Sequence, residues 1–131
     1  DLHPRVRRQR QMCIRDSPIY LQIMEHFKVQ IASGKLEVGD KIQPVRELAL
    51  EAGVNPNTMQ KALSELEREG YLESQRTSGR FVADRGKQID RLKQDMALEL
   101  CESFHNGMKK IGFTPEEAIA EYKEYISRIK E

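Results

Sequence analysis

The stretch from residue 40 to residue 83 most constrains what this chain can fold into, because it predicts two helices, a tight turn and a hairpin. Pro44 suits a helix start, and Gly53 suits a helix end because glycine adopts a left-handed φ without strain. Asn55 is a predicted N-cap of the second helix, with Pro56 at its first position. Two helices joined by a turn that contains glycine predict a helix-turn-helix.

Apolar residues spaced three or four positions apart mark the buried face of each predicted helix. These residues are Val45, Leu48, Ala49 and Ala52 in the first helix, and Met59, Ala62, Leu63 and Leu66 in the second. An earlier helix over residues 18–34 has its own stripe at Ile19, Ile23, Phe27 and Ile31, widened by Leu21, Met24 and Ala32. We expect Ser17 and Pro18 to cap this earlier helix and Gly34 to end it.

The polar face of the second predicted helix gives the functional hypothesis. It carries amides, hydroxyls and one lysine, at Asn57, Thr58, Gln60, Lys61 and Ser64. Such groups at a helix N-terminus suit base edges and phosphates in the major groove of DNA. The alternative is a solvated polar face on a helical pair that only packs against the rest of the domain.

A predicted hairpin follows the two helices. Residues 71–75 and 80–83 read as strands, joined by a turn at residues 76–79. Basic residues at its tip predict a wing, and residues 41–42 are expected to add a short strand to its sheet.

The ordered motifs GDKI, QPVREL, ALEAGVNPNTMQKAL, SELEREGYLES and QRTSGRFV together resemble the winged helix-turn-helix of GntR-type bacterial transcription regulators. The resemblance extends over residues 18–83, and the VNPNT segment with a short C-terminal part is most similar to the YtrA-type subgroup. It implies a DNA-binding regulator, typically a repressor, with a double-stranded operator as its partner. The full set of DNA-binding candidates is Arg46, Asn55, Asn57, Thr58, Gln60, Lys61, Arg76, Thr77, Ser78, Gly79 and Arg80.

This sequence departs from the family pattern at several of those positions. The family commonly has arginine at the positions of Pro56 and Gln60, glycine at that of Thr77, and threonine at that of Arg80. Guanidinium forks are the usual readers of guanine, so we expect Asn57 and Gln60 to read adenine instead. The operator is therefore not assumed to match the general consensus of the family.

Net charge by itself gives no argument for DNA binding. The formal charge of the 131 residues is +1, and residues 1–17 contribute five arginines against two aspartates, so residues 18–131 sum to −2. The placement of the charges matters more than their sum, because exposed charges more than about 10 Å apart are largely screened. Residues 1–17 form a basic leader, interpreted either as a disordered segment outside the fold or as an arm that follows phosphates.

Other classes of function find little support. Cys13 and Cys101 lack CxxC spacing, the three histidines have no ligand spacing, and no cofactor loop or nucleophile–base pattern occurs. We therefore expect no enzyme activity, no metal and no cofactor. No apolar run approaches the roughly 20 residues of a membrane helix, so a cytoplasmic protein without membrane contact is expected.

Residues 85–131 predict a dimerisation region after a DNA-binding domain at residues 18–84. A long helix over residues 88–111 and a second helix after Thr114 each carry an apolar stripe, and two such helices do not bury both stripes alone. The predicted dimer contacts are Leu92, Met96, Leu100, Phe104, Met108, Ile119, Tyr122 and Ile126. Packing back onto the DNA-binding domain is the alternative to a homodimer.

Two questions stay open at this level. A winged helix that contacts protein instead of DNA is the alternative function. An unknown small-molecule effector is the other open partner, with Phe104, Met108, Tyr122 and Tyr125 at the dimer interface as its expected location, although these residues also fit a plain core.

Overall fold

The computed structural model describes residues 18–130, and it divides into two compact units between Lys93 and Gln94. Its elements in chain order are α2 (Ile19–Ser33), α3 (Val45–Ala52), α4 (Pro56–Arg68), β1 (Leu72–Gln75), β2 (Gly79–Val82), α5 (Gln88–Lys110) and α6 (Pro115–Ile129). This confirms the predicted mainly helical fold with a small β wing.

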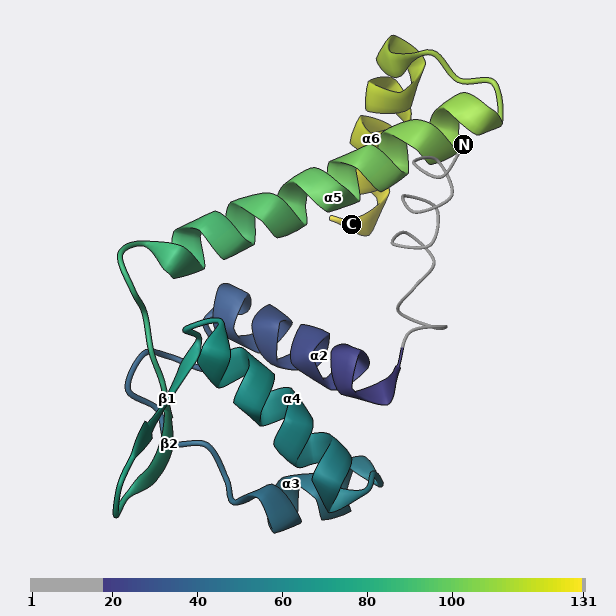
Figure 1. Ribbon diagram of the computed structural model, residues 1–131. Coiled ribbons are helices and arrows are strands. Elements are labelled where there is room, and N and C mark those ends of the chain that lie inside the picture. The colour runs from purple at the N-terminus through teal and green to yellow at the C-terminus, as the bar shows by residue number, and fades with distance from the viewer. Residues whose placement is uncertain (1–17, 131) are drawn as a thin grey trace, which may run out of the picture. The chain divides into compact units, whose positions relative to one another are not determined.

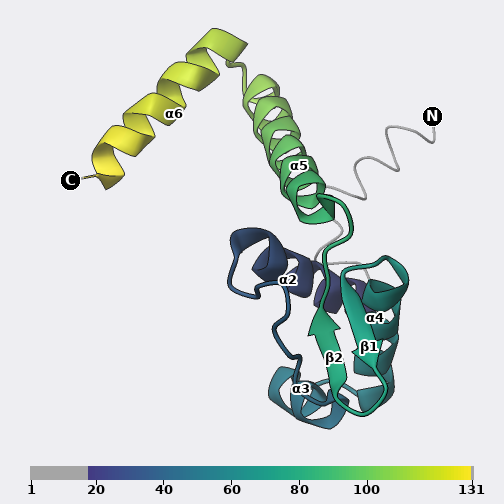
Figure 2. The same ribbon diagram turned by 90° about the vertical axis from the view of Figure 1, so that its left-hand side faces the viewer.

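Helix α4 is the centre of unit 1. Helices α2 and α3 and strand β1 all pack against α4, as Figure 1 shows. The largest fully buried side chains of this core are Ile31, Leu63, Leu66, Leu72 and Val82. Figures 1 and 2 place α3, the first turn of α4 and the tip of the hairpin at the same end of unit 1.

Local signals in the sequence set the helix ends. Gly34 and Gly53 end α2 and α3 with φ of +86° and +69°, as predicted. Pro44 stands at the N-cap of α3, and Asn55 caps α4. At the start of α2, Pro18 is the N-cap and makes no side-chain cap bond, while Ser17 lies outside the described residues.

Three residues of the predicted apolar stripes are wrong as core residues. Ile19 is 50% exposed and Leu21 is 41% exposed, and Ala52 is exposed as well. Ile19 and Ala52 are the first residue of α2 and the last residue of α3. A helical period predicts the face on which a residue lies, but it does not predict how far the neighbouring helix covers that face.

The wing is an antiparallel pair with Leu72 opposite Val82 and Gln75 opposite Gly79. The strands are Leu72–Gln75 and Gly79–Val82, where the sequence predicts 71–75 and 80–83. The predicted third strand is a single bridge between Lys41 and Phe81. It is held by the Ile42 amide, which donates to the Arg80 carbonyl at 2.9 Å.

The first turns of α5 belong to unit 1. Gln88 Nε2 donates to the Glu69 carbonyl at 2.6 Å, at the end of α4. A Cβ at Gly70, whose φ is +93°, would come within 3.3 Å of the Gln88 side chain. Leu92 is only 7% exposed within one chain, which corrects its place in the predicted dimer contacts. The predicted domain boundary after residue 84 therefore falls before these contacts.

Unit 2 consists of the rest of α5 and of α6. Thr114 forms the predicted capping box with Glu117: the Glu117 amide donates to Thr114 Oγ1 at 3.1 Å, and the Thr114 amide donates to Glu117 Oε1 at 2.9 Å. The rings of Phe104 and Tyr122 meet edge to face, with centroids 6.1 Å apart. Figure 2 shows the two helices diverging from their connection, so the predicted hairpin is open.

Candidate DNA-binding surface

The first turn of α4 is built around Asn55. Its side-chain oxygen Oδ1 accepts a hydrogen bond from the Asn57 amide at 2.7 Å, and its carbonyl accepts from the Thr58 amide at 3.0 Å. Helix N-termini leave amide groups without intrahelical partners, and the cap satisfies one of them. Asn55 therefore orients the turn that carries Asn57, in addition to lying on the candidate surface.

The outer face of α4 is polar, as predicted. Asn57, Gln60 and Lys61 are exposed, while the opposite face of the helix is buried. Gln60 Nε2 donates to Ser64 Oγ at 3.0 Å. An adenine needs one donor and one acceptor from a glutamine amide, and Gln60 retains both, because Nε2 has a second hydrogen and Oε1 is not used in this bond.

Lys61 has a partner that the sequence does not predict. Its Nζ lies 4.1 Å from the centroid of the Tyr20 ring, within the range of a cation–π interaction. Tyr20 lies in the first turn of α2 and is half-buried. The residues around it belong to the stretch that resembles the family, but no helical period links Tyr20 to Lys61.

Two arginines add positive charge near the first turn of α4. Arg46 lies on α3, and Arg76 lies in the turn of the hairpin; both are exposed. Among the ion pairs of residues 18–130, none involves Arg46 or Arg76.

Thr77 and Ser78 are also exposed in the turn of the hairpin, which the Ser78 amide closes by donating to the Gln75 carbonyl at 3.1 Å. Gly79 follows with φ of +102°, a conformation that favours glycine.

Arg80 is expected to be an exposed positive charge of the wing, but the structure places it in a largely buried ion pair. Its side chain is 18% exposed, and its Nε donates to Glu67 Oε1 at 3.1 Å. Ser74, the residue opposite Arg80 in the hairpin, is the main cause of the lowered pKa of Glu67, through a hydrogen bond to the carboxylate; the bond from Arg80 adds to it. The Arg80 guanidinium therefore joins the wing to α4, and its charge is compensated.

The acidic residues of α4 are all paired and lie in its second half. Glu65 pairs with Arg68, and Glu69 pairs with Lys28 of α2 at 3.0 Å. Glu67 pairs with Arg80, as described above. The first half of α4, from Pro56 to Ser64, contains no acidic residue. Within the first half of α4 itself, Lys61 is therefore the only charged residue.

Unit 2 presents apolar side chains to solvent. The large residues concerned are Leu98, Leu100, Phe104, Ile111, Ile119, Tyr122, Tyr125 and Ile129. Met96, Met108 and Ile126 are half-buried. Isolated exposed apolar residues are normal, but so many large ones on two helices are typical of an interaction surface.

Residues 18–130 contain no group of three or more histidine, cysteine, aspartate or glutamate residues placed to hold a metal ion. None of the helices in this range combines the length and the apolar character needed to traverse a bilayer.

A helix-turn-helix with a β hairpin behind it and a polar, basic recognition helix defines a winged-helix regulator of transcription. The sequence pattern of the family described as "Bacterial regulatory proteins, gntR family" matches residues 19–82. The chain is 40% identical over 108 residues to the uncharacterised HTH-type transcriptional regulator YhcF of Bacillus subtilis, covering 82% of this chain and 89% of YhcF. The chain belongs to the GntR family.

Two further relatives agree with this assignment. The HTH-type transcriptional repressor YtrA of Bacillus subtilis is 44% identical over 71 residues, which cover 54% of this chain and 55% of YtrA. A GntR family transcriptional regulator from Listeria monocytogenes has a similar structure, with a TM-score of 0.75 and 38% identity over 82% of this chain and 95% of that one. The family and these relatives are regulators of transcription and not enzymes.

Proposed function

We propose that this protein is a dimeric, sequence-specific DNA-binding regulator that represses transcription from a near-palindromic operator. The observation that carries the proposal is the outer face of α4, where exposed Asn57, Gln60 and Lys61 stand on a capped first turn. Amide and ammonium groups in this position match base edges and phosphates of the major groove.

The distribution of charge supports DNA as the partner of this face. Arg46, Lys61 and Arg76 supply the cations, while the carboxylates of α4 are paired in its second half. We infer that Arg46, Lys61 and Arg76 contact phosphates and that Thr77, Ser78 and Gly79 bring the wing close to the backbone. Arg80 acts by holding the wing against α4.

The dimer is supported by the apolar faces of α5 and α6. The proposed contacts are Met96, Leu100, Phe104, Met108, Ile119, Tyr122 and Ile126, all of which are exposed or half-buried within one chain. Two α4 helices related by a two-fold axis would read half-sites about one turn of DNA apart, so a near-palindrome is expected. In this scheme residues 18–84 bind DNA, and within residues 85–131 the proposed dimer contacts begin at Met96, because the first turns of α5 belong to unit 1. Repression is proposed because the relative YtrA is named a repressor.

A selection of random duplex DNA by the purified 131-residue chain, at two salt concentrations, tests the proposal. We expect a two-fold symmetric motif and an affinity that falls steeply with salt, because each phosphate contact releases counterions. No enriched motif at either salt concentration would contradict it and favour a winged helix that contacts protein.

A further inference from the structure

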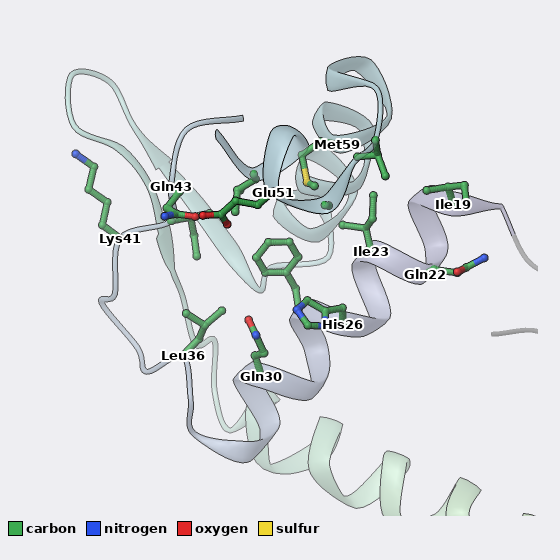
Figure 3. Close-up of a pocket in the computed structure, with 15 residues that line it drawn as sticks. Ile19, Gln22, Ile23, His26, Gln30, Leu36, Lys41, Gln43, Glu51 and Met59 are labelled. Carbon is green, nitrogen blue, oxygen red and sulfur yellow. The ribbon is translucent and has the colours of Figure 1, made fainter. Parts of the chain in front are cut away.

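Unit 1 contains a hollow that lies behind the proposed DNA-binding face. Its volume is about 710 Å³, and its walls come from α2, the segment before α3, α3 itself and the start of α4. Figure 3 shows the side chains that line it. Ligand pockets in proteins range from about 300 to 1,000 Å³, so the hollow has the size of a small-molecule site.

The inner wall of the hollow is apolar. Ile23, Phe27, Ile42 and Met59 line it, and each is at most 9% exposed. At the rim Ile19 is 50% exposed, although it lines the same space. An apolar molecule seated here would pack against this wall and would remove the exposed rim residue Ile19 from water, which is favourable in proportion to the apolar area covered.

Polar groups lie on two opposite sides of this apolar space. Glu51 and Gln43 both line the hollow, and in Figure 3 the Lys41 ammonium points away from it. His26 and Gln30 of α2 stand on the other side. Among the ion pairs of residues 18–130, none involves Glu51. The charge directed at an occupant is therefore negative.

We propose that this hollow binds a small molecule with an apolar or aromatic body and one ammonium group. The body lies against Ile23, Phe27 and Met59, and the ammonium group pairs with Glu51 beside Gln43. A carboxylate on the same body is disfavoured, because it would face Glu51.

The position of the hollow makes it a site of regulation, and this part rests on the proposed function. Leu48, Glu51 and Ala52 come from α3, which carries Arg46, and Met59 lies next to Thr58 on α4. An occupant that prefers one arrangement of α3 against α2 changes the affinity for DNA, and DNA changes the affinity for the occupant by the same factor.

Binding is tested on the full chain with three probes that share one body: 2-phenylethylamine, 2-phenylethanol and 3-phenylpropionate. The chain is labelled at isoleucine and methionine methyl groups, and NMR shifts are followed during titration. We expect saturable shifts at Ile23, Ile42 and Met59, with the amine binding tightest and the acid weakest. No saturable shift with any probe, or an acid that binds as well as the amine, would overturn the site.

Two substitutions on α3 locate the binding, each with a matched control on the same helix. Glu51→Gln is expected to weaken the amine about two- to fivefold, the size of an exposed ion pair, and to leave the alcohol unchanged. Ala52→Phe fills the hollow and is expected to abolish binding of all three probes. Glu47→Gln and Leu50→Phe are the controls, because both residues are exposed and neither lines the hollow. Equal binding in Ala52→Phe and Leu50→Phe, with both variants folded, would refute the location.

The regulatory part is measured separately, as the operator affinity at saturating amine. We expect a change for the wild-type chain and none for Ala52→Phe. If the operator affinity does not change with the amine, the regulation is overturned. The methyl shifts would still show that the amine binds in the hollow. Saturable shifts without specific DNA binding would instead overturn the proposed function.

Discussion

Lys61 on α4 and Tyr20 on α2 form a contact between two helices, with the lysine Nζ 4.1 Å from the centroid of the tyrosine ring. The ring restricts where the ammonium group of an exposed lysine can lie. Since Lys61 is a proposed phosphate contact, we expect the first helix of the domain to affect DNA binding through this contact.

Replacing Tyr20 tests that support. Tyr20→Leu is expected to weaken operator binding about two- to fivefold, because an exposed cation–π contact contributes about 0.5–1 kcal/mol. Tyr20→Phe keeps the ring and should bind nearly as well as the wild type. In the Lys61→Ala background the Tyr20→Leu change should have little further effect, as measured by fluorescence anisotropy. Equal losses in both backgrounds would mean that the two residues act independently.

Arg46→Ala and Lys61→Ala are expected to weaken DNA binding without unfolding the protein, because both side chains are exposed. Each change should reduce the slope of log affinity against log salt by about one, as for the loss of one phosphate contact. Glu47→Ala on α3 is the control for Arg46 and should not weaken binding. Unchanged affinity in both variants would contradict the proposed docking of α3 and α4.

Asn55→Ala is expected to destabilise the protein by about 1 kcal/mol, since it removes the 2.7 Å cap bond to the Asn57 amide. Asn55→Asp retains an acceptor at the cap and should restore most of the stability. Urea denaturation measures the difference. If the alanine and aspartate variants unfold at the same urea concentration, the cap does not stabilise α4.

The Glu67 contact gives a prediction about pH. Hydrogen bonds from Ser74 and then Arg80 lower the pKa of Glu67 in the folded state. A lowered pKa means that the ionised carboxylate stabilises the folded protein above the unfolded value of about 4.3, and that this contribution is lost as pH falls through the folded pKa. Glu67→Gln should therefore be less stable than wild type near pH 7, and the difference should shrink as pH falls through the folded pKa.

The size of that effect is modest, because Glu67 keeps a 33% exposed side chain. We expect less than about 1 kcal/mol, measured by denaturation at several pH values. Glu73→Gln is the matched control on β1, because Glu73 is exposed and takes part in none of the ion pairs of residues 18–130. An effect of Glu67→Gln that stays constant through the whole acid titration would exclude an ionic contribution.

Phe104→Asp is expected to shift the protein from dimer to monomer, because it places a charge in the proposed apolar interface. The molar mass from light scattering measures the change. Ser103→Asp adds the same charge to the preceding residue of α5, and this variant should remain dimeric. A dimer that persists in Phe104→Asp would place the interface elsewhere.

Much of the DNA-binding unit was predictable because the relevant interactions are local. Pro44, Gly53 and Asn55 define helix ends within one turn of the chain, and the structure confirms all three. The stripe of Met59, Leu63 and Leu66 likewise indicated the buried face of α4, which leaves Asn57 and Lys61 outside. The exposed Ile19 and Ala52 were mispredicted because coverage by another helix is not a local property.

The sequence alone determined which segments are helices, where they end, and which face of each helix is apolar, since those properties depend on residues a few positions apart. Only the tertiary structure decided which side chains meet across elements. Arg80 pairs with Glu67 instead of facing outward, Leu92 is buried in unit 1, and Tyr20 supports Lys61. The hollow lined by α2, α3 and the start of α4 also depends on the tertiary structure. The physical reason is that such contacts join distant parts of the chain, and their geometry follows from how the helices and strands pack.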